Sequence, residues 1–356
     1  MASLIDLSSL TLNPQEALNV SEAVFEKVYA KPALQDAHLV ATGIQMKTQI
    51  PFYGLFALVG KKAAGSCDVN AETKAIAASQ KYWDPMLISY RLTHCQEDIS
   101  QLFKMWKRAE SALSTWEVMP SEQIAFLADR VVDSTLESVL RITSLADTAE
   151  NVIGSGGNLT AGTTIAYFTM LDGLWKQIFT AVAAAPALRY TINENAGASY
   201  AAQDSLAADR ALLVFRTLYE KIDTRARQAG SLVYQVTDSL FKNWMSFLEE
   251  KSLAFTLQRT EEGKGTGRWT YRDIPIVVRF DWDRNIRAYF NTGAKWYLPH
   301  RAILTPINNI PIGTSDENDM SNLDMFYDRT GKKHYSDVAY YIDVKLLEEY
   351  MLTVAY

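Results

Sequence analysis

Few residues of this sequence have the type and spacing that chemistry requires. A metal site needs histidines, cysteines or carboxylates at short regular intervals, and a catalytic thiol needs a recognisable partner motif. The four histidines and two cysteines are scattered along the chain instead, at His38, His94, His300, His334, Cys67 and Cys95. We therefore expect the histidines to be structural or exposed, and we expect neither a metal site nor a catalytic thiol.

Two short motifs resemble parts of ligand sites in composition only. Gly154-Ser155-Gly156-Gly157 has the glycines of a phosphate loop, but it follows a predicted helix and lacks the Gly-Lys-Ser/Thr ending. We interpret it as a hinge. Asp281-Trp282-Asp283 places two carboxylates two residues apart, which share a face only on a strand. We interpret this triplet as a surface turn, so the sequence predicts no catalytic residue and no cofactor.

Composition narrows the class of protein. Of 356 residues, 48% are hydrophobic and 21% are charged, which is typical of a globular chain with a sizeable core. The net charge of −6 argues against nucleic-acid binding over a broad basic face. No apolar run is long enough to span a membrane, the first residues lack a basic signal region, and two cysteines make no disulfide framework. We therefore expect a cytoplasmic location.

The elements that would position any site begin with a long amphipathic helix over residues 120–151. Ser121 is a suitable N-cap, and Glu122 adds negative charge to the first turn. Apolar residues recur at helical spacing, at Ile124, Leu127, Val131, Leu136, Val139, Leu140 and Leu145. About thirty residues at ~1.5 Å per residue predict a rod of roughly 45 Å. A rod of that length can brace a layered or elongated body.

Residues 38–67 predict a long hairpin or two-stranded arm. Alternating apolar segments are interrupted there by Gly43, Pro51, Gly54 and Gly60. Such a ribbon is marginal alone in water, so we expect it to lie on the rest of the chain or on another subunit. The preceding residues predict an extended arm that contains a short helix.

The middle of the chain predicts helices and its end predicts strands. Helical spacing covers residues 96–113, 206–228 and 237–251, and strand-like segments follow at 274–278, 296–298, 302–306, 325–327 and 338–342. The last two segments, with Gly331 between them, predict a hairpin or one long bent strand. Helices in the middle and strands at both ends, without the β-α-β alternation of a doubly wound sheet, predict an α+β fold.

The order of these parts resembles the major capsid proteins of tailed bacteriophages, whose Hong-Kong-phage-type fold is shared with encapsulin shells. The stretch from Gly43-Ile44 to Gly60-Lys61-Lys62 resembles the extended loop of that fold. Residues 120–151 resemble its spine helix, and Met325-Phe326-Tyr327-Asp328-Arg329 resembles its long peripheral-domain strand. The resemblance covers nearly the whole chain.

The resemblance implies a division of the chain and a contact surface. The expected parts are an N-terminal arm (1–37), an extended hairpin (38–78), a peripheral domain with the spine helix (79–151), an axial domain (152–318), a return strand of the peripheral domain (319–345) and a closing segment (346–356). Inter-subunit contacts are implied at Gly43, Ile44, Ile50, Phe52, Leu58, Lys61 and Lys62. Lys61 and Lys62 lie in the stretch that resembles the extended loop, where one relative forms a lysine–asparagine crosslink. We interpret these two residues as surface lysines.

The function implied by the resemblance is structural, without catalysis. The subunit would assemble with itself into pentamers and hexamers of an icosahedral or prolate bacteriophage capsid that encloses double-stranded DNA. Scaffold, portal or decoration proteins would be further partners, with weak non-specific DNA contact and no membrane contact. Assembly would occur in the bacterial cytoplasm, and the product would be the virion. The alternatives are another phage structural protein or encapsulin-like compartment subunit, and an enzyme with an inter-subunit site; particle size separates shell from enzyme.

Overall fold

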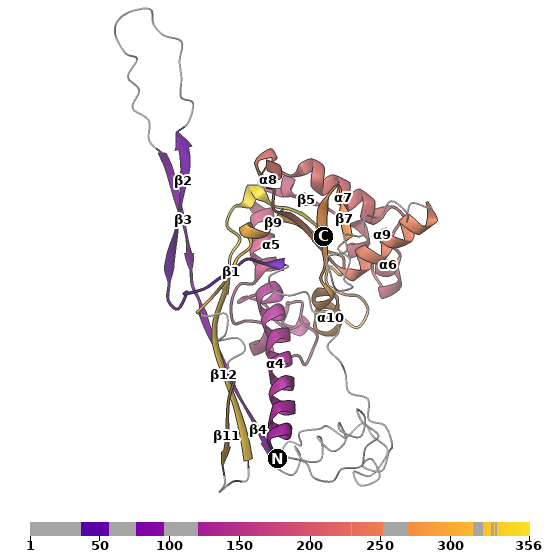
Figure 1. Cartoon of the computed structure of the whole chain (residues 1–356). Coiled ribbons are helices and arrows are strands. Elements are labelled where there is room, and N and C mark those ends of the chain that lie inside the picture. The colour runs from indigo at the N-terminus through magenta and orange to yellow at the C-terminus, as the bar shows by residue number, and fades with distance from the viewer. Residues whose placement is uncertain are drawn as a thin grey trace, which may run out of the picture.

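The computed structural model describes residues 37–56, 76–95, 120–228, 230–251, 269–315, 323–328, 331 and 333–356. They form a lobe of helices and strands, a long helix beside a long strand, and a two-stranded ribbon that projects away from both (Figure 1). No helix within these ranges is long and apolar enough to cross a membrane. The predicted arm before residue 37, with its short helix, and the predicted helix at 96–113 lie outside the described residues.

The first sheet is built around the long strand β12. All ten residues of β4 pair antiparallel with one edge of β12, from Met86 to Cys95. β10 and β11 pair antiparallel with the other edge. β1 continues the sheet as a parallel partner of β10. The β11–β12 pairing confirms the predicted hairpin around Gly331. Within the described ranges the strands of this sheet are β1 (Val40–Ala41), β4 (Met86–Cys95), β10 (Ile312–Thr314), β11 (Leu323–Asp328) and β12 (Lys333–Val344).

The long helix α4 (Pro120–Leu145) covers one face of this sheet. Alternate residues of β12 are buried, as a strand with one covered face requires; they are Val338, Tyr340, Ile342 and Val344. Val131 and Val139 of α4 belong to the same core cluster. The hydroxyl of Tyr90 on β4 forms a hydrogen bond with Thr135 of α4. The predicted rod is therefore confirmed, and so is its apolar face at Val131, Val139, Leu140 and Leu145, whereas the side chains of Ile124 and Leu127 lie outside the described residues.

The rod ends at Leu145 and not at the predicted residue 151. The amide of Asp147 leaves the helical pattern and donates to the carbonyl of Phe168 at 2.8 Å, and the amide of Gly173 donates to the carbonyl of Ala146 at 2.8 Å. Gly173 lies so close that a Cβ there would come within 2.9 Å of the Ala146 backbone. Packing against a distant segment therefore ends the helix, before the glycines at 154–157 are reached.

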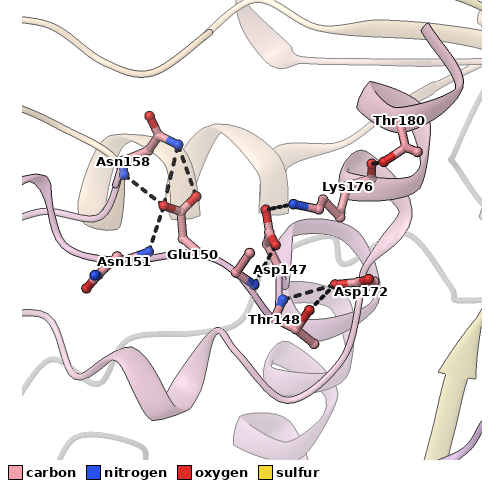
Figure 2. Close-up of polar contacts among 9 residues, drawn as sticks. Asp147, Thr148, Glu150, Asn151, Asn158, Asp172, Lys176 and Thr180 are labelled. Atoms are coloured by element: carbon pink, nitrogen blue, oxygen red, sulfur yellow. Dashed lines mark hydrogen bonds and ion pairs between the residues drawn. The ribbon is translucent and has the colours of Figure 1, made fainter. Parts of the chain in front are cut away.

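Polar side chains join the end of α4 to the start of α5 (Leu174–Ala184). Lys176 Nζ lies 2.9 Å from Asp147 Oδ2, and the hydroxyl of Thr148 donates to Asp172 Oδ1 at 2.7 Å (Figure 2). The hydrogen bond from Lys176 to Asp147 raises the pKa of the lysine. These contacts hold α5 beside the end of the rod, and α5 adds Trp175 and Ile178 to the core cluster that contains Val131.

The second sheet mixes parallel and antiparallel strands in the order β5-β13-β9-β6-β8-β7. β6 and β8 are parallel neighbours, and the helix α9 (Asp238–Glu250) and the strand β7 lie between them in the chain, so this part of the described structure contains a β-α-β crossover. The repeated alternation of a doubly wound sheet is not found in the described ranges, and the α+β class is confirmed. The strands are β5 (Arg189–Tyr190), β6 (Leu232–Val236), β7 (Trp269–Tyr271), β8 (Ile274–Val278), β9 (Ala302–Pro306) and β13 (Thr353–Ala355).

Helices cover this sheet and form a second core cluster. The helix predicted over residues 237–251 is confirmed, and its Leu240, Trp244 and Leu248 are buried. The Phe215 ring lies 5.6 Å from Trp244 and 5.2 Å from Tyr234, in edge-to-face arrangements that favour aromatic pairs. The helices of this part are α6 (Tyr200–Asp204), α7 (Arg210–Lys221), α8 (Thr224–Gln228), α9 (Asp238–Glu250) and α10 (Phe280–Tyr289).

The single helix predicted over residues 206–228 is wrong, because the chain bends between α7 and α8. Ile222 has extended backbone angles and is buried. Asp223 then accepts a hydrogen bond from the amide of Arg225 at 2.8 Å, as a residue before a new helix does. Burial of Ile222 thus redirects the chain within a continuous helical pattern.

Two further predictions are wrong in the same region. Residues 281–283 are not a surface turn, because they open α10, with Asp281 and Trp282 buried. Residues 296–298 are not a strand. Leu298 has a left-handed φ of 48°, and its carbonyl accepts from Arg301 Nε at 2.8 Å. The buried Arg301 side chain therefore shapes this loop.

The apolar face of α4 gives the first testable prediction. Val131→Asp would bury a charge without a partner, because Val131 is 3% exposed. We expect a loss of roughly 3–5 kcal/mol in the free energy of unfolding, or insoluble protein. Thermal unfolding or solubility measures this. The matched control is Ser134→Asp at an exposed position of the same helix, and equal behaviour of both variants would place Val131 on the solvent side.

Candidate functional site

The candidate functional site is the two-stranded ribbon and its base. β2 (Thr48–Phe56) pairs antiparallel with β3 (Ile76–Trp83), from Thr48 opposite Trp83 to Phe56 opposite Ile76. The returning strand thus lies beyond the predicted interval 38–67. A register shift between Tyr53 and Phe56 interrupts the ladder near Gly54, as a bulge at a glycine does. The ribbon projects from the rest of the chain (Figure 1).

Both ends of the ribbon meet at one glycine of the first sheet. The amide of Ile44 donates to the carbonyl of Thr314 at 3.0 Å, and Ile44 is 7% exposed. A Cβ on Gly313 would come within 2.9 Å of the Trp83 ring and 3.0 Å of Ile44 Cδ1. Ile44, four residues before β2, and Trp83, the last residue of β3, therefore pack on the same piece of backbone, and only glycine fits beneath them.

Polar contacts hold the returning strand at the same place. The amide of Asp84 donates to Asp343 Oδ2 at 2.7 Å, and Lys81 Nζ donates to the carbonyl of Leu346 at 2.8 Å. Burial raises the pKa of Asp343, although the Asp84 amide and Lys345 act in the opposite direction. A cavity of about 300 Å³ lies beside Lys81 and is lined mainly by α5. The base of the ribbon is thus fixed to β12 and to the segment that follows it.

A buried polar network holds the chain just before the ribbon. Arg279 is fully buried and binds Asp281 with two hydrogen bonds of 2.9 and 2.8 Å. Its Nη1 donates to Gln235 Oε1 at 2.7 Å and lies 3.0 Å from His38 Nε2. Because a guanidinium cannot accept, His38 Nε2 accepts, and His38 Nδ1 donates to the carbonyl of Ile310 at 3.0 Å. His38 is therefore neutral, and burial, aided by the Arg279 charge, lowers its pKa to about 3.

Large apolar side chains are exposed around the ribbon. Five of the eight such residues in the described ranges lie between positions 39 and 87, namely Leu39, Met46, Tyr82, Met86 and Leu87. Met46 is 73% exposed, and Lys47 Nζ lies 5.5 Å from the Tyr82 ring centre. Apolar side chains gathered in one region indicate a contact surface, whereas scattered ones carry no such meaning. We call these five residues the apolar base.

The seven predicted contact residues fall into three groups. Ile50 and Phe52 lie on β2 and are half-buried. Gly43, with a φ of 81°, and Ile44 donate their amides to Ser315 and Thr314 of their own chain, and Ile44 is buried there. Leu58, Lys61 and Lys62 lie outside the described residues.

Sequence reasoning missed the apolar base. The signal that could have found it is the concentration of apolar residues on both sides of a ribbon too thin to cover them.

The motifs that could do chemistry are used structurally. His300 is buried, with Nδ1 2.7 Å from Ser239 Oγ and Nε2 2.8 Å from the carbonyl of Gln203. Asp283 accepts the amide of Asp238 at 2.6 Å at the start of α9, and burial raises its pKa to about 7. No group of three or more metal-binding side chains occurs in the part of the chain that the structure describes. Cys67 and the side chains of His94 and His334 lie outside the described residues.

The glycine-rich segment forms a closed turn. Gly156 has a φ of 86°, and its amide donates to the carbonyl of Ile153 at 3.0 Å. A Cβ on Gly157 would come within 1.9 Å of the Asn151 carbonyl oxygen. Glu150 accepts the amide of Asn158 across the turn at 2.8 Å. The glycines here serve close backbone approach, and the segment does not follow a strand as a dinucleotide loop would.

Comparison with known proteins rests on structure alone. No protein-family model matches this sequence, and no curated protein matches it. A chain from Gordonia phage Cozz aligns with a TM-score of 0.54 at 12% identity, covering 95% of this chain and 90% of that one. A chain from Mycobacterium phage Ogopogo gives 0.49 at 10% identity, covering 99% of both chains. A chain from the cyanophage A-1(L) capsid asymmetric unit gives 0.46 at 13% identity, covering 94% and 95%.

The contact at Gly313 gives a prediction about the ribbon base. Gly313→Ala pushes a methyl group into the Trp83 ring and Ile44, which we expect to cost about 1–3 kcal/mol of folding free energy. Urea unfolding and limited proteolysis of the ribbon measure the effect. Gly154→Ala is the matched control, because nothing lies within 4 Å of a Cβ there. Equal stability of the two variants would mean that the ribbon base accommodates the added methyl group at little cost in folding free energy.

The neutral histidine gives a prediction of pH dependence. Below pH 6.5 the unfolded chain protonates His38, whereas the folded chain excludes that proton until about pH 3. Stability therefore falls as the pH drops through this window, by about 1.4 kcal/mol per pH unit. His38→Gln removes this contribution, so its free energy of urea unfolding should change less between neutral and acid pH than that of the unmodified protein. Parallel pH profiles of the two proteins would contradict the assignment.

Proposed function

We propose that this chain, which has the α+β fold of phage major capsid proteins, is a structural subunit of a bacteriophage capsid. Copies of the chain associate into pentamers and hexamers, and these close into an icosahedral or prolate shell around double-stranded DNA. The fold extends over 95% of the chain in the comparison with the highest TM-score reported above. Fold alone does not determine function, so the proposal depends on what the ribbon requires.

The observation that carries the proposal is the projecting ribbon with exposed apolar side chains at its base. Two strands alone bury too little surface to be independently stable. The anchors at Gly313 and Asp343 fix the base, but not the length that projects. A second copy of the chain would supply the missing cover by placing its own surface against Ile50, Phe52 and the apolar base.

The geometry of such a contact favours rings. If the ribbon of one copy lies on a different surface of the next, the contact is heterologous, and repetition closes into a ring or continues as a filament. In a ring of five or six copies, each ribbon is covered by a neighbouring copy. We assign the apolar base, Ile50, Phe52, and the undescribed Leu58, Lys61 and Lys62 to this contact.

The division of the chain follows the same proposal. We assign residues 1–37 to an N-terminal arm, 38–78 to the extended hairpin, 79–151 and 319–345 to a peripheral domain, 152–318 to an axial domain and 346–356 to a closing segment. The described residues form one core cluster around α4–β12 and another around α7–α9, and the first also contains Trp175 and Trp282 of the proposed axial domain.

The proposed role needs no catalysis, and we propose that the chain is not an enzyme. Scaffold, portal or decoration proteins are proposed as further partners. Assembly takes place in the host bacterial cytoplasm, and the product is the virion capsid.

Removing the ribbon tests the proposal. We expect that replacing residues 50–81 by a short glycine–serine link leaves a folded subunit, because Ile44, Trp83 and Gly313 keep their contact. That subunit should not form rings or shells. Size-exclusion chromatography and negative-stain microscopy compare it with the full chain. Shells of normal size from the shortened chain would refute the assembly role of the ribbon.

Point substitutions refine the same test without shortening the chain. Met86→Ser with Leu87→Ser reduces the apolar base at two positions that are 46% and 49% exposed. Tyr167→Ser is the matched control, because Tyr167 is 59% exposed but lies away from the ribbon in the sequence. Assembly should weaken in the double variant only. Equal loss in both would indicate a general effect of surface polarity on assembly.

A further inference from the structure

A group of positive side chains lies where the end of α7, α8, β5 and the turn between β7 and β8 come together. Figure 1 shows these elements at one end of the helical lobe. The group consists of Arg189, Lys221, Arg227 and Arg272, all exposed, and we call it the cationic patch. Lys221 Nζ donates to the carbonyl of Arg189 at 2.7 Å, which joins two of its members directly.

A tyrosine holds two of the guanidinium groups together. Arg272 Cζ lies 4.7 Å from the Tyr219 ring centre, and Arg227 Cζ lies 5.3 Å from the same centre. Arg272 also lies 5.6 Å from the Tyr271 ring centre. A guanidinium carries five N–H donors. Arg227 donates one of them to the carbonyl of Ile222 at 3.4 Å, and its other donors and those of Arg272 have no acceptor among the described residues.

The backbone that carries Arg272 is in an unfavourable conformation. Arg272 and Asp273 have φ angles of 52° and 63°, and Tyr271 opposite Ile274 closes a two-residue hairpin. Glycine or asparagine is the usual choice where both turn residues are left-handed. Here an arginine occupies such a position and rests against Tyr219. A turn needed only for chain reversal would not require an arginine.

The cationic patch is not neutralised within the described residues. Its four cations form no ion pair there, and the exposed carboxylates of Glu220 and Asp273 pair with none of them. The neighbouring Arg225 differs, because Asp223 binds it at 3.0 Å. That contact lowers the pKa of Asp223 to about 2. In the part of the chain that the structure describes, these four cations therefore lie near one another without an ion-pair partner, although the net charge of the chain is −6.

We propose that the cationic patch binds the phosphate backbone of double-stranded DNA. Guanidinium edges match phosphate oxygens in geometry, and each neutralised phosphate releases counterions, which makes the contact favourable and dependent on salt. Choosing DNA over an acidic protein rests on the proposed function, because the shell would enclose DNA. The binding is independent of base sequence, since the patch offers phosphate contacts and no element that enters a groove. It is local and weak, as the net charge of the chain requires.

The test compares two triple variants of the full chain. Lys221→Gln, Arg227→Gln and Arg272→Gln together remove three cations of the patch. The matched control, Lys242→Gln, Arg284→Gln and Arg287→Gln, removes three cations that are already paired, with Asp238, Glu137 and Asp204. Fluorescence anisotropy with a short labelled DNA duplex, titrated at several salt concentrations, gives affinity and salt slope for each. Circular dichroism and thermal unfolding check the fold.

The patch variant should bind DNA at least about tenfold more weakly at low salt, with a salt slope reduced by about 2–3. The control should change affinity less than about threefold, because its cations already have partners. Arg272→Lys keeps the charge and should bind nearly as well as the unmodified chain. Equal losses in both triple variants, or none in the patch variant, would overturn the proposal.

Assembly is measured on the same variants, so that this proposal and the proposed function can fail separately. If the patch variant keeps its DNA affinity but no longer associates, the patch contacts an acidic surface of a second copy, and the DNA proposal is wrong. If DNA binding follows the expected pattern while the unmodified chain forms no rings or shells, the DNA-binding proposal is supported and the proposed capsid function is wrong.

Discussion

The extended part of this molecule depends on the close packing of Trp83 and Ile44 over the backbone of Gly313. A two-stranded ribbon has no interior of its own, so its direction must be set where it leaves the body. The chain enters the ribbon after Ile44 and leaves it at Trp83, both of which pack on Gly313 of β10, and Gly313 lies opposite Asp343 in the pairing of β10 with β12. Asp343 also accepts the amide of Asp84 just after the ribbon. The ribbon therefore takes its orientation from β12, the strand that also carries the face covered by α4.

Two buried arginines hold segments that apolar packing alone would leave undefined. Arg279 connects the chain before the ribbon to the second sheet through His38 and Gln235, and Asp281 balances its charge. Arg301 instead donates to the carbonyls of Leu298 and Tyr297 and lies 4.8 Å from the Trp175 ring centre. Its pKa falls to about 10, chiefly through burial. Burying a cation is costly unless its donors are satisfied, and here the satisfied donors specify the path of two loops.

The proposed functions use two surfaces of different chemistry. The apolar base surrounds the ribbon, where contact with another copy would remove apolar surface from water. The cationic patch lies on the lobe of the second sheet, where four cations with no ion-pair partner among the described residues favour a polyanion. An apolar contact tolerates salt, whereas a phosphate contact weakens with it. Salt therefore separates assembly from DNA binding in experiments on one protein.

Local pattern determined much of this protein: the apolar face of α4, the β11–β12 hairpin, the helix α9 and the α+β class follow from periodicity and turn residues. The sequence also indicated a ribbon, because its alternation and glycines are local features. Tertiary structure decided the rest. The close approach of Gly173, a residue outside the helix, ends α4. Asp281 is buried because its carboxylate pairs with the buried Arg279. Ile44 is buried against its own chain, and Arg272, on the turn between β7 and β8, contacts the ring of Tyr219 on α7. Each of these outcomes depends on a partner far away in the chain, and periodicity contains no information about such partners.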